Sequence, residues 1–477
     1  MGAFPFVRQF VVALVCLGSW TETGAAEAKP GPSSNVGAVT VAAPFPLEQA
    51  LADFRSTIPV IVLRGQTAGP VSEDSSYSKF LMHVYGDGPS PGSGQGRTTN
   101  GLGPGTSPDF SATIGLRLHG QVSRKFAKLS YRLELQDEAG RDQAAALLGL
   151  PAEADWVLQG PWLDKSLIRN AFSYDLARAM GLPAMRTRVC ELFVNSNGNP
   201  VSMADYMGVY QLTEQIKRGT NRVALTSLTP EQTGWPEITG GYLLSWDVGS
   251  GTYLRRWNQI QVRYPKSPSP EQLRWLDDWF TGFDQTLKGR KFSDPLEGYA
   301  AHIVVDAWVD YILFEELIFN LDGYVRSFYL HKDRNAKLRP GPVWDHDLAL
   351  GHQFPHGTSF EEWWYVRRAA PHGWIKRLVA DPNFIGRMAE RWRVFRRGPL
   401  SDSALETRID EFARPLLSGA AARNFSRWPI LAVERPFPKP NDYITIASET
   451  YAEQITALKR FVRQRAAWMD AHLKPGE

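Results

Sequence analysis

The chain has 477 residues, of which 43% are apolar and 22% are charged. This balance is typical of a folded globular protein and argues against intrinsic disorder. The formal net charge of +3 is too small for a chain of this length to indicate a nucleic-acid-binding protein. The length suits one large domain or two to three ordinary ones.

The first residues have the pattern of a secretory signal. Arg8 is followed by an apolar run over residues 10–18, and small residues suitable for cleavage lie at 24–28. The run is too short for a stable membrane anchor. We therefore expect a signal peptide at residues 1–28 and export to the periplasm or the cell exterior. No integral membrane segment is expected after cleavage. Only Cys190 then remains, so stability must come from the core.

An Ala-, Pro-, Gly- and Ser-rich stretch predicts a linker over residues 29–57. Short alternating or β-branched runs then predict strands at 58–63, 79–85, 113–119, 129–135, 188–194, 207–213 and 240–246. The runs at 113–119 and 129–135 flank a turn and form a predicted hairpin, with Lys128 at the start of its second strand. A Gly-rich loop at 86–108 is long enough to act as a flexible flap.

Helical periodicity appears once before residue 250 and dominates after it. The early helix is predicted at 163–180, with Asp164 as its N-cap. Later helices are predicted at 271–287, 297–319, 371–394, 401–417 and 451–473. The sequence therefore predicts an α+β fold. Residues 58–250 form a β-rich N-terminal lobe, and residues 251–477 form a mostly helical C-terminal lobe.

A pair of acids follows an apolar entry in the helical part. If residues 343–347 are extended, Asp345 and Asp347 share one face and His346 takes the other. Two close carboxylates repel each other unless a cation or a shared proton intervenes. Hard oxygen ligands at this spacing suit Mg²⁺ or Mn²⁺. The same residues could instead cap a turn or pair with arginine.

Asp322 is a second acid after an apolar run, and Lys128 precedes both acidic segments. A lysine, an acid that orients a hydroxyl and a later metal-binding acid occur in this order in protein-kinase-type phosphoryl transfer. No Gly-rich phosphate loop of the usual pattern is visible. Lys128 could therefore be an ordinary solvated lysine, and Asp322 could cap a helix end or loop.

The segment GLRLHGQVSRKFAKLSY at 115–131 resembles the RGNSS…KKSY signature of the CotH family, the spore-coat-H-like atypical protein kinases. Later blocks follow in the family's order: DKSLIRN at 164–170, VYQLTE at 209–214, NLD at 320–322, FYLH at 328–331, WDHD at 344–347, WIKRL at 374–378, DPNF at 381–384 and RQRAAW at 463–468. The resemblance spans roughly residues 58–473, nearly all of the chain after the signal.

The resemblance implies an atypical protein-kinase-like fold that binds ATP with Mg²⁺ (or Mn²⁺) and phosphorylates Ser or Thr of a protein substrate. Lys128 falls on the family's phosphate-contacting lysine, a catalytic and ATP-binding position. Asp322 falls on the catalytic acid. Asp345 falls on the metal-binding acid, and Asp347 is a second candidate metal ligand.

Two further residues are candidates for binding ATP. Arg124, in the turn before Lys128, is placed to help hold phosphate. Glu214 ends a predicted strand, where it would lie near the base or ribose or, equally, be a structural partner of an arginine. The chain also departs from the family at Ser327, where an asparagine able to bind a second metal is usual.

The leading expectation is thus an exported kinase that acts on a secreted or surface protein. Serine is a poorer Mg²⁺ ligand than asparagine, and ATP is scarce outside the cytoplasm. Both points favour the alternative of a catalytically weak, pseudokinase-like scaffold or surface adhesion protein. The 16 tryptophans leave transfer to a glycan or small molecule as a third possibility.

Overall fold

The computed structural model describes residues 49–473 except 70, 72–75, 87–98, 101, 103–104, 248, 353–359, 368–372 and 438–443. These residues belong to one compact unit, residues 38–477. The expected signal peptide and most of the expected linker lie outside the described residues. Much of the expected flap at 86–108 does so as well.

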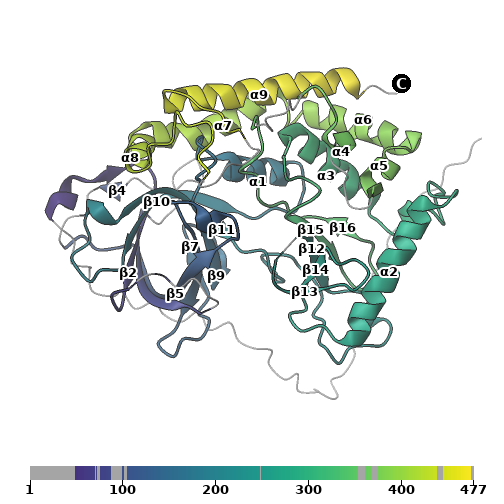
Figure 1. Cartoon of the computed structure of the whole chain (residues 1–477), viewed down its shortest axis with the longest axis horizontal. Coiled ribbons are helices and arrows are strands. Elements are labelled where there is room, and N and C mark those ends of the chain that lie inside the picture. The colour runs from purple at the N-terminus through teal and green to yellow at the C-terminus, as the bar shows by residue number, and fades with distance from the viewer. Residues whose placement is uncertain are drawn as a thin grey trace, which may run out of the picture. The chain divides into compact units, whose positions relative to one another are not determined.

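Seven strands close into a barrel in the order β10-β11-β9-β6-β5-β3-β2 (Figure 1). They are β2 (Val60–Gly65), β3 (Ser78–Tyr85), β5 (Phe110–His119), β6 (Ser130–Gln136), β9 (Asp155–Gln159), β10 (Thr187–Asn195) and β11 (Tyr206–Glu214). The ring closes because β10 pairs antiparallel with β11 and parallel with β2. The hairpin expected from alternation is confirmed as β5 and β6.

Alternation along the strands fills the barrel with apolar side chains. On β5, Leu116 and Leu118 point inward, and on β6 Tyr131 and Leu133 do the same. Two separate two-stranded antiparallel sheets come from segments between the barrel strands or before them. They are β1 (Arg55–Ser56) with β4 (Thr99–Asn100), and β7 (Ala145–Leu147) with β8 (Leu150–Glu153). The side chains that alternate with these inward-pointing residues along each strand face away from the barrel interior.

A second sheet has five strands in the order β13-β14-β12-β15-β16. They are β12 (Tyr242–Trp246), β13 (Thr252–Tyr253), β14 (Ile260–Tyr264), β15 (Phe328–Lys332) and β16 (Arg339–Pro340). The central strand β12 pairs with both β14 and β15. The sheet therefore draws strands from both sides of residue 250, where the sequence placed the boundary between the lobes.

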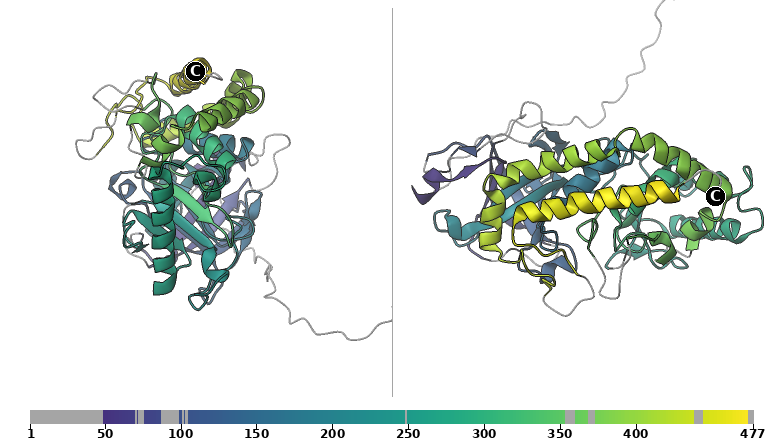
Figure 2. Two further views of the ribbon diagram at one scale, coloured as in Figure 1. Left: turned by 90° about the vertical axis from the view of Figure 1, so that its right-hand side faces the viewer. Right: turned by 90° about the horizontal axis from the view of Figure 1, so that it is seen from above.

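The helices are α1 (Arg169–Ala179), α2 (Pro270–Lys288), α3 (Val305–Ile318), α4 (Trp364–Arg367), α5 (Trp374–Leu378), α6 (Pro382–Arg396), α7 (Asp402–Leu417), α8 (Ala420–Arg427) and α9 (Tyr451–His472). The long helix α9 runs along α7 (Figures 1 and 2). The chain is thus a mixed α+β protein, as the sequence predicts. Helix α1 starts at Arg169 rather than at 163, because Asp164 holds a turn that precedes the helix. Its side chain accepts bonds from the N–H groups of Ser166 and Arg169.

A buried ion pair connects α9 to α3. Arg465 Nη2 lies 3.0 Å from Glu316 Oε2, and both side chains are fully buried. The Glu316 carboxylate also accepts bonds from the N–H groups of Trp364 and Tyr365 and from the Tyr324 hydroxyl. Removing either ion would leave a buried charge without its partner, which is strongly destabilising. The pair therefore fixes the end of α3, from which the segment carrying Asp322 departs.

Candidate functional site

The acidic segment after β16 is not a strand. Val343 forms one isolated bridge with Ala184, and Asp345 has a left-handed backbone with a φ of 70°. The expectation that 343–347 is extended is therefore wrong, because a left-handed residue breaks the alternation of faces. His346 is fully buried. It packs edge-on against Tyr174 and Phe314, and its Nε2 lies 3.4 Å from Glu315.

Helix α1 holds this acidic segment through its backbone. The Tyr174 hydroxyl accepts a bond from the Asp345 N–H at 3.0 Å. The Asn170 side chain accepts one from the His346 N–H at 2.6 Å. Arg169 donates to the carbonyls of residues 349 and 350 while it pairs with Asp164. These bonds fix the backbone and leave the carboxylate of Asp345 available for other contacts.

Asp322 is brought to the same place by the loop that ends α3. Phe319 ends the helix in a left-handed conformation. The Asn320 side chain then accepts a bond from the Asp322 N–H at 3.2 Å and donates to the Asp345 carbonyl at 3.5 Å. One amide therefore joins the two acidic segments, although they lie more than twenty residues apart in the chain.

The three carboxylates interact electrostatically. Burial, and then the charge of Asp322, raise the pKa of Asp345 to about 6, while a bond from the Ser327 hydroxyl lowers it. Burial raises the pKa of Asp347 well above its ordinary value, and the charges of Asp345 and Asp322 raise it further. Like charges in a partly desolvated place disfavour ionisation of each other. A cation placed among them would relieve this repulsion.

The backbone around these acids is unusually strained. The non-glycine residues with positive φ in this part of the chain are Phe319, Tyr324, Ser327, Asn335, Asp345 and Leu350. Such conformations persist only where the surrounding structure enforces them, and they gather at functional sites. The bonds from α1 and Asn320 supply that enforcement at Asp345.

The residues present fit a divalent metal ion bound together with phosphates. Among the described residues, no group of three or more His, Cys, Asp or Glu side chains is arranged to hold a metal by itself. Mg²⁺ in nucleotide sites is usually bound by one or two carboxylates, with phosphate oxygens and waters completing its shell. Asp345 and Asp347 are half-buried carboxylates of this kind. They could supply the protein's share of such a shell.

Lys128 lies at the base of the β5–β6 hairpin and is buried, with 1% of its surface exposed. Its Nζ donates to Asn424 of α8 at 2.7 Å and lies over the ring of Tyr210. The structure thus excludes an ordinary solvated lysine. Burial lowers the pKa of Lys128 well below its usual value, and the charge of Asp164 counteracts this. The charge of Asp164 also raises the pKa of Asp347, so it acts on both the lysine and this acid.

Arg124 and Glu214 have different surroundings. Arg124 is exposed in the hairpin turn, and its Nη2 donates to the Leu118 carbonyl at 3.3 Å. Glu214 is buried, and its Oε1 accepts bonds from Arg186 at 2.8 Å and from Arg222 at 2.6 Å. The structure therefore places Glu214 as the partner of two arginines, which was the structural alternative for this residue.

The model of the CotH kinase protein family matches residues 116–469, from within β5 to near the end of α9. The chain belongs to the CotH kinase protein family. Lys128, Asp322, Asp345 and Asp347 all lie inside the matched range. The comparison with curated proteins gave no match.

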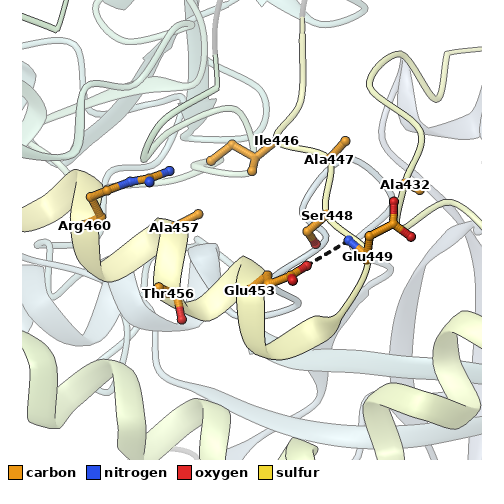
Figure 3. Close-up of a pocket in the computed structure, with 9 residues that line it drawn as sticks. All are labelled: Ala432, Ile446, Ala447, Ser448, Glu449, Glu453, Thr456, Ala457 and Arg460. Atoms are coloured by element: carbon orange, nitrogen blue, oxygen red, sulfur yellow. Dashed lines mark hydrogen bonds between the residues drawn. The ribbon is translucent and has the colours of Figure 1, made fainter.

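One pocket of this CotH kinase family member lies away from these acids (Figure 3). It has a volume of about 430 Å³ and is lined by Ala432, Ile446, Ala447, Ser448, Glu449, Glu453, Thr456, Ala457 and Arg460. Glu453 accepts a bond from the Glu449 N–H and also caps the start of α9. None of the candidate site residues lines this pocket. Within the described ranges, no helix combines the length and apolar character that crossing a membrane requires.

The sequence did not predict which residues of this CotH family member hold the backbone around Asp322 and Asp345. Asn170 and Asn320 stand in the sequence only as members of longer motifs, and Tyr174 lies outside those motifs. The available signal was the placement of Asn170 and Asn320 within the family blocks at 164–170 and 320–322. A motif shared with the family can point to such residues, but only the fold shows which backbone groups they bind.

Proposed function

We propose that this CotH family member is an exported kinase with a kinase-like two-lobed fold. It transfers the γ-phosphate of ATP to Ser or Thr hydroxyls of a secreted or surface protein. The observation that carries the proposal is the gathering of Asp322, Asp345 and Asp347 in one place, in a chain of the CotH kinase family. Phosphoryl transfer requires one acid that orients the acceptor and others that hold the metal.

In the proposed reaction, the acceptor hydroxyl oxygen forms a bond to the γ-phosphorus of ATP. The bond between that phosphorus and the β–γ bridging oxygen breaks, and ADP leaves with the electron pair. The carboxylate of Asp322 orients the hydroxyl and takes its proton. Asp345 and Asp347 would hold Mg²⁺ (or Mn²⁺), which when bound offsets the charge on the phosphates. Tyr174 and Asn170 keep the acidic backbone in its left-handed form.

Lys128 is proposed to contact phosphate, and Arg124 to assist from the turn. Replacing Lys128 by Met should lower ATP affinity by about 10-fold or more, because a charge-assisted bond to phosphate contributes about 1.5–3 kcal/mol. Folding should persist, since Asn424 keeps its bond from the Val209 N–H at 3.1 Å. Calorimetric titration with ATP and Mg²⁺ measures the effect, and the exposed Lys125→Met is the matched control. If Lys128→Met and Lys125→Met bind ATP with equal affinity, Lys128 does not contact the phosphates.

The proposal is tested with the purified chain and γ-labelled ATP. We expect ATP plus Mg²⁺ to raise the melting temperature and label to appear on Ser or Thr of a peptide mixture or of the chain itself. Label should not appear when EDTA removes the metal. If ATP with Mg²⁺ gives no detectable binding at millimolar concentrations, the kinase proposal is wrong.

Ser327 supports a second candidate, a scaffold or surface adhesion protein that keeps the fold without efficient catalysis. Its hydroxyl donates to Asp345 Oδ2 at 3.1 Å, where the family usually has an asparagine able to bind a second metal. Binding of ATP without transfer would favour this candidate. Restoration of transfer by Ser327→Asn would show that the serine is the cause.

A further inference from the structure

Strand β12 brings a further acid, Asp247, to the edge of the candidate site. Strands β12 and β15 are antiparallel neighbours (Figure 1), and their ladder ends with Trp246 opposite Phe328. Asp247 and Ser327 are the next residues at this end of the two strands. The Asp247 N–H donates to the Gln259 carbonyl at 3.1 Å, so residue 247 continues the sheet. Opposed Cα atoms of such a ladder are about 4.5–5.5 Å apart, which places Asp247 near Ser327.

Ser327 in turn contacts the proposed metal-binding acid. Its hydroxyl donates to Asp345 Oδ2 at 3.1 Å. Burial and the charge of Asp322 raise the pKa of Asp345, and the charge of Asp247 raises it as well. Burial also raises the pKa of Tyr329, to which the charges of Asp247 and Asp345 both add. The strand register and the electrostatics therefore agree that Asp247 lies close to Asp345.

A neighbouring arginine orients the Asp247 carboxylate. Arg263 Nη2 lies 3.2 Å from Asp247 Oδ2, and Arg263 Nε donates to the Ser245 hydroxyl at 2.8 Å. Arg263 also lies over the ring of Tyr329, with its Cζ 5.9 Å from the ring centroid. The Asp247 side chain stays 22% exposed, so a ligand from solvent can still reach it. Carboxylates that bind metal ions are commonly held in this way by a hydrogen-bond donor behind them.

The loop that begins at Asp247 also contacts the β5–β6 hairpin. The side chain of Gln121, in the hairpin turn, occupies the space that a Cβ on Gly249 would fill. Gly249 has a φ of 141°, in the region that favours glycine. The same turn carries Arg124, a candidate phosphate-binding residue. Asp247 therefore belongs to a segment that contacts the proposed phosphate-binding turn, while its charge acts on the proposed metal-binding acid.

We propose that Asp247, together with Asp345 and the phosphates of ATP, binds a second divalent cation, Mg²⁺ (or Mn²⁺). This inference rests on the proposed kinase function and names a further metal ligand for it. Protein kinases hold two such ions, and an asparagine usually supplies a ligand to the second. Ser327 replaces that asparagine, and the carboxylate of Asp247 provides the oxygen ligand that serine supplies poorly. The cation would also offset the repulsion between Asp247 and Asp345.

The test counts the Mn²⁺ ions that the purified chain binds with a non-hydrolysable ATP analogue, from the electron paramagnetic resonance signal of the free ion. The analogue titrated without protein is the blank. We expect two bound ions for the wild type and one for Asp247→Ala. Affinity for the second ion should fall about 100-fold or more, because losing a residue that only orients a metal ligand already costs about 10- to 100-fold. Two ions in Asp247→Ala would overturn the inference.

Thermal denaturation in EDTA separates metal binding from folding. The matched control is Asp278→Ala, because Asp278 also pairs with an arginine, Arg256, but lies on the surface of α2. A partly exposed ion pair contributes little to stability, so Asp247→Ala should melt at nearly the same temperature as the control. A much lower melting temperature would mark Asp247 as the structural counter-ion of Arg263 and contradict the inference.

Residue 327 provides a second, independent test. Asparagine at this position restores the ligand that is usual in the family, so Asp247→Ala combined with Ser327→Asn should regain the second ion. A count that stays at one ion would show that residue 327 does not reach this cation, and it would contradict the placement of Asp247 beside it.

The outcomes also distinguish the inference from the proposed function. A wild type that binds one Mn²⁺ with the analogue and transfers phosphate from ATP would overturn the inference and leave the kinase function intact. A wild type that binds two ions, one of them lost in Asp247→Ala, but transfers no phosphate would support the metal site and contradict the kinase function. A wild type that binds neither the analogue nor Mn²⁺ would overturn both.

Discussion

Replacing Asp322 by Asn is expected to lower phosphate transfer by about 10²- to 10⁴-fold, the range for loss of a general base. Affinity for ATP with Mg²⁺ should change little, because the proposed role of this carboxylate is to orient the acceptor hydroxyl. The turn itself should survive. The Asp322 N–H donates to Asn320, and its carbonyl accepts bonds from the N–H groups of Val325 and Arg326. These backbone bonds do not require the carboxylate.

The measurement is single-turnover transfer of labelled γ-phosphate, with ATP affinity determined in parallel. Asp278→Asn is a suitable control, because its side chain is 68% exposed and lies on the surface of α2. Transfer at the wild-type rate by Asp322→Asn would exclude Asp322 as the base. Loss of ATP binding together with transfer would instead place Asp322 among the metal ligands.

The elements that alternate or repeat locally could be predicted from the sequence. The β5–β6 hairpin, α2, α7 and α9 all follow from patterns that a few neighbouring residues create. The closure of the barrel could not be predicted, because β10 pairs in parallel with β2, which lies more than a hundred residues earlier. The second sheet was also missed in part. Strand β15 is only five residues long, and its place is set by pairing with β12.

The sequence predicts which acids belong to the candidate site, but it does not predict their backbone conformation or their contacts. The acidic pair and Asp322 stand out as carboxylates after apolar runs. The left-handed Asp345 does not, since its conformation depends on Tyr174 and Asn170 of a distant helix. The burial of Lys128 depends on Asn424, which is 296 residues away.

Replacing Asp345 by Asn should lower transfer by about 10²- to 10³-fold, the range for loss of a charge-stabilising group. It should also abolish the increase in melting temperature that Mg²⁺ produces with ATP. Without metal, the variant should be more stable than the wild type at about pH 8, because it removes a carboxylate from among like charges. Thermal denaturation with and without Mg²⁺ measures both effects. Asp278→Asn should behave as the wild type in each.

The pH dependence of the wild type follows from the same residue. The folded pKa of Asp345 is raised from 3.8 to about 6, so the folded chain binds more protons than the unfolded chain between these values. Its contribution to stability is therefore favourable at low pH and is lost as the pH rises through about 6. Mg²⁺ requires the ionised carboxylate, so its apparent affinity should rise as the pH increases from about 5 to 7 and then level off. A metal affinity that is constant over this range, or that falls, would show that Asp345 does not bind the ion.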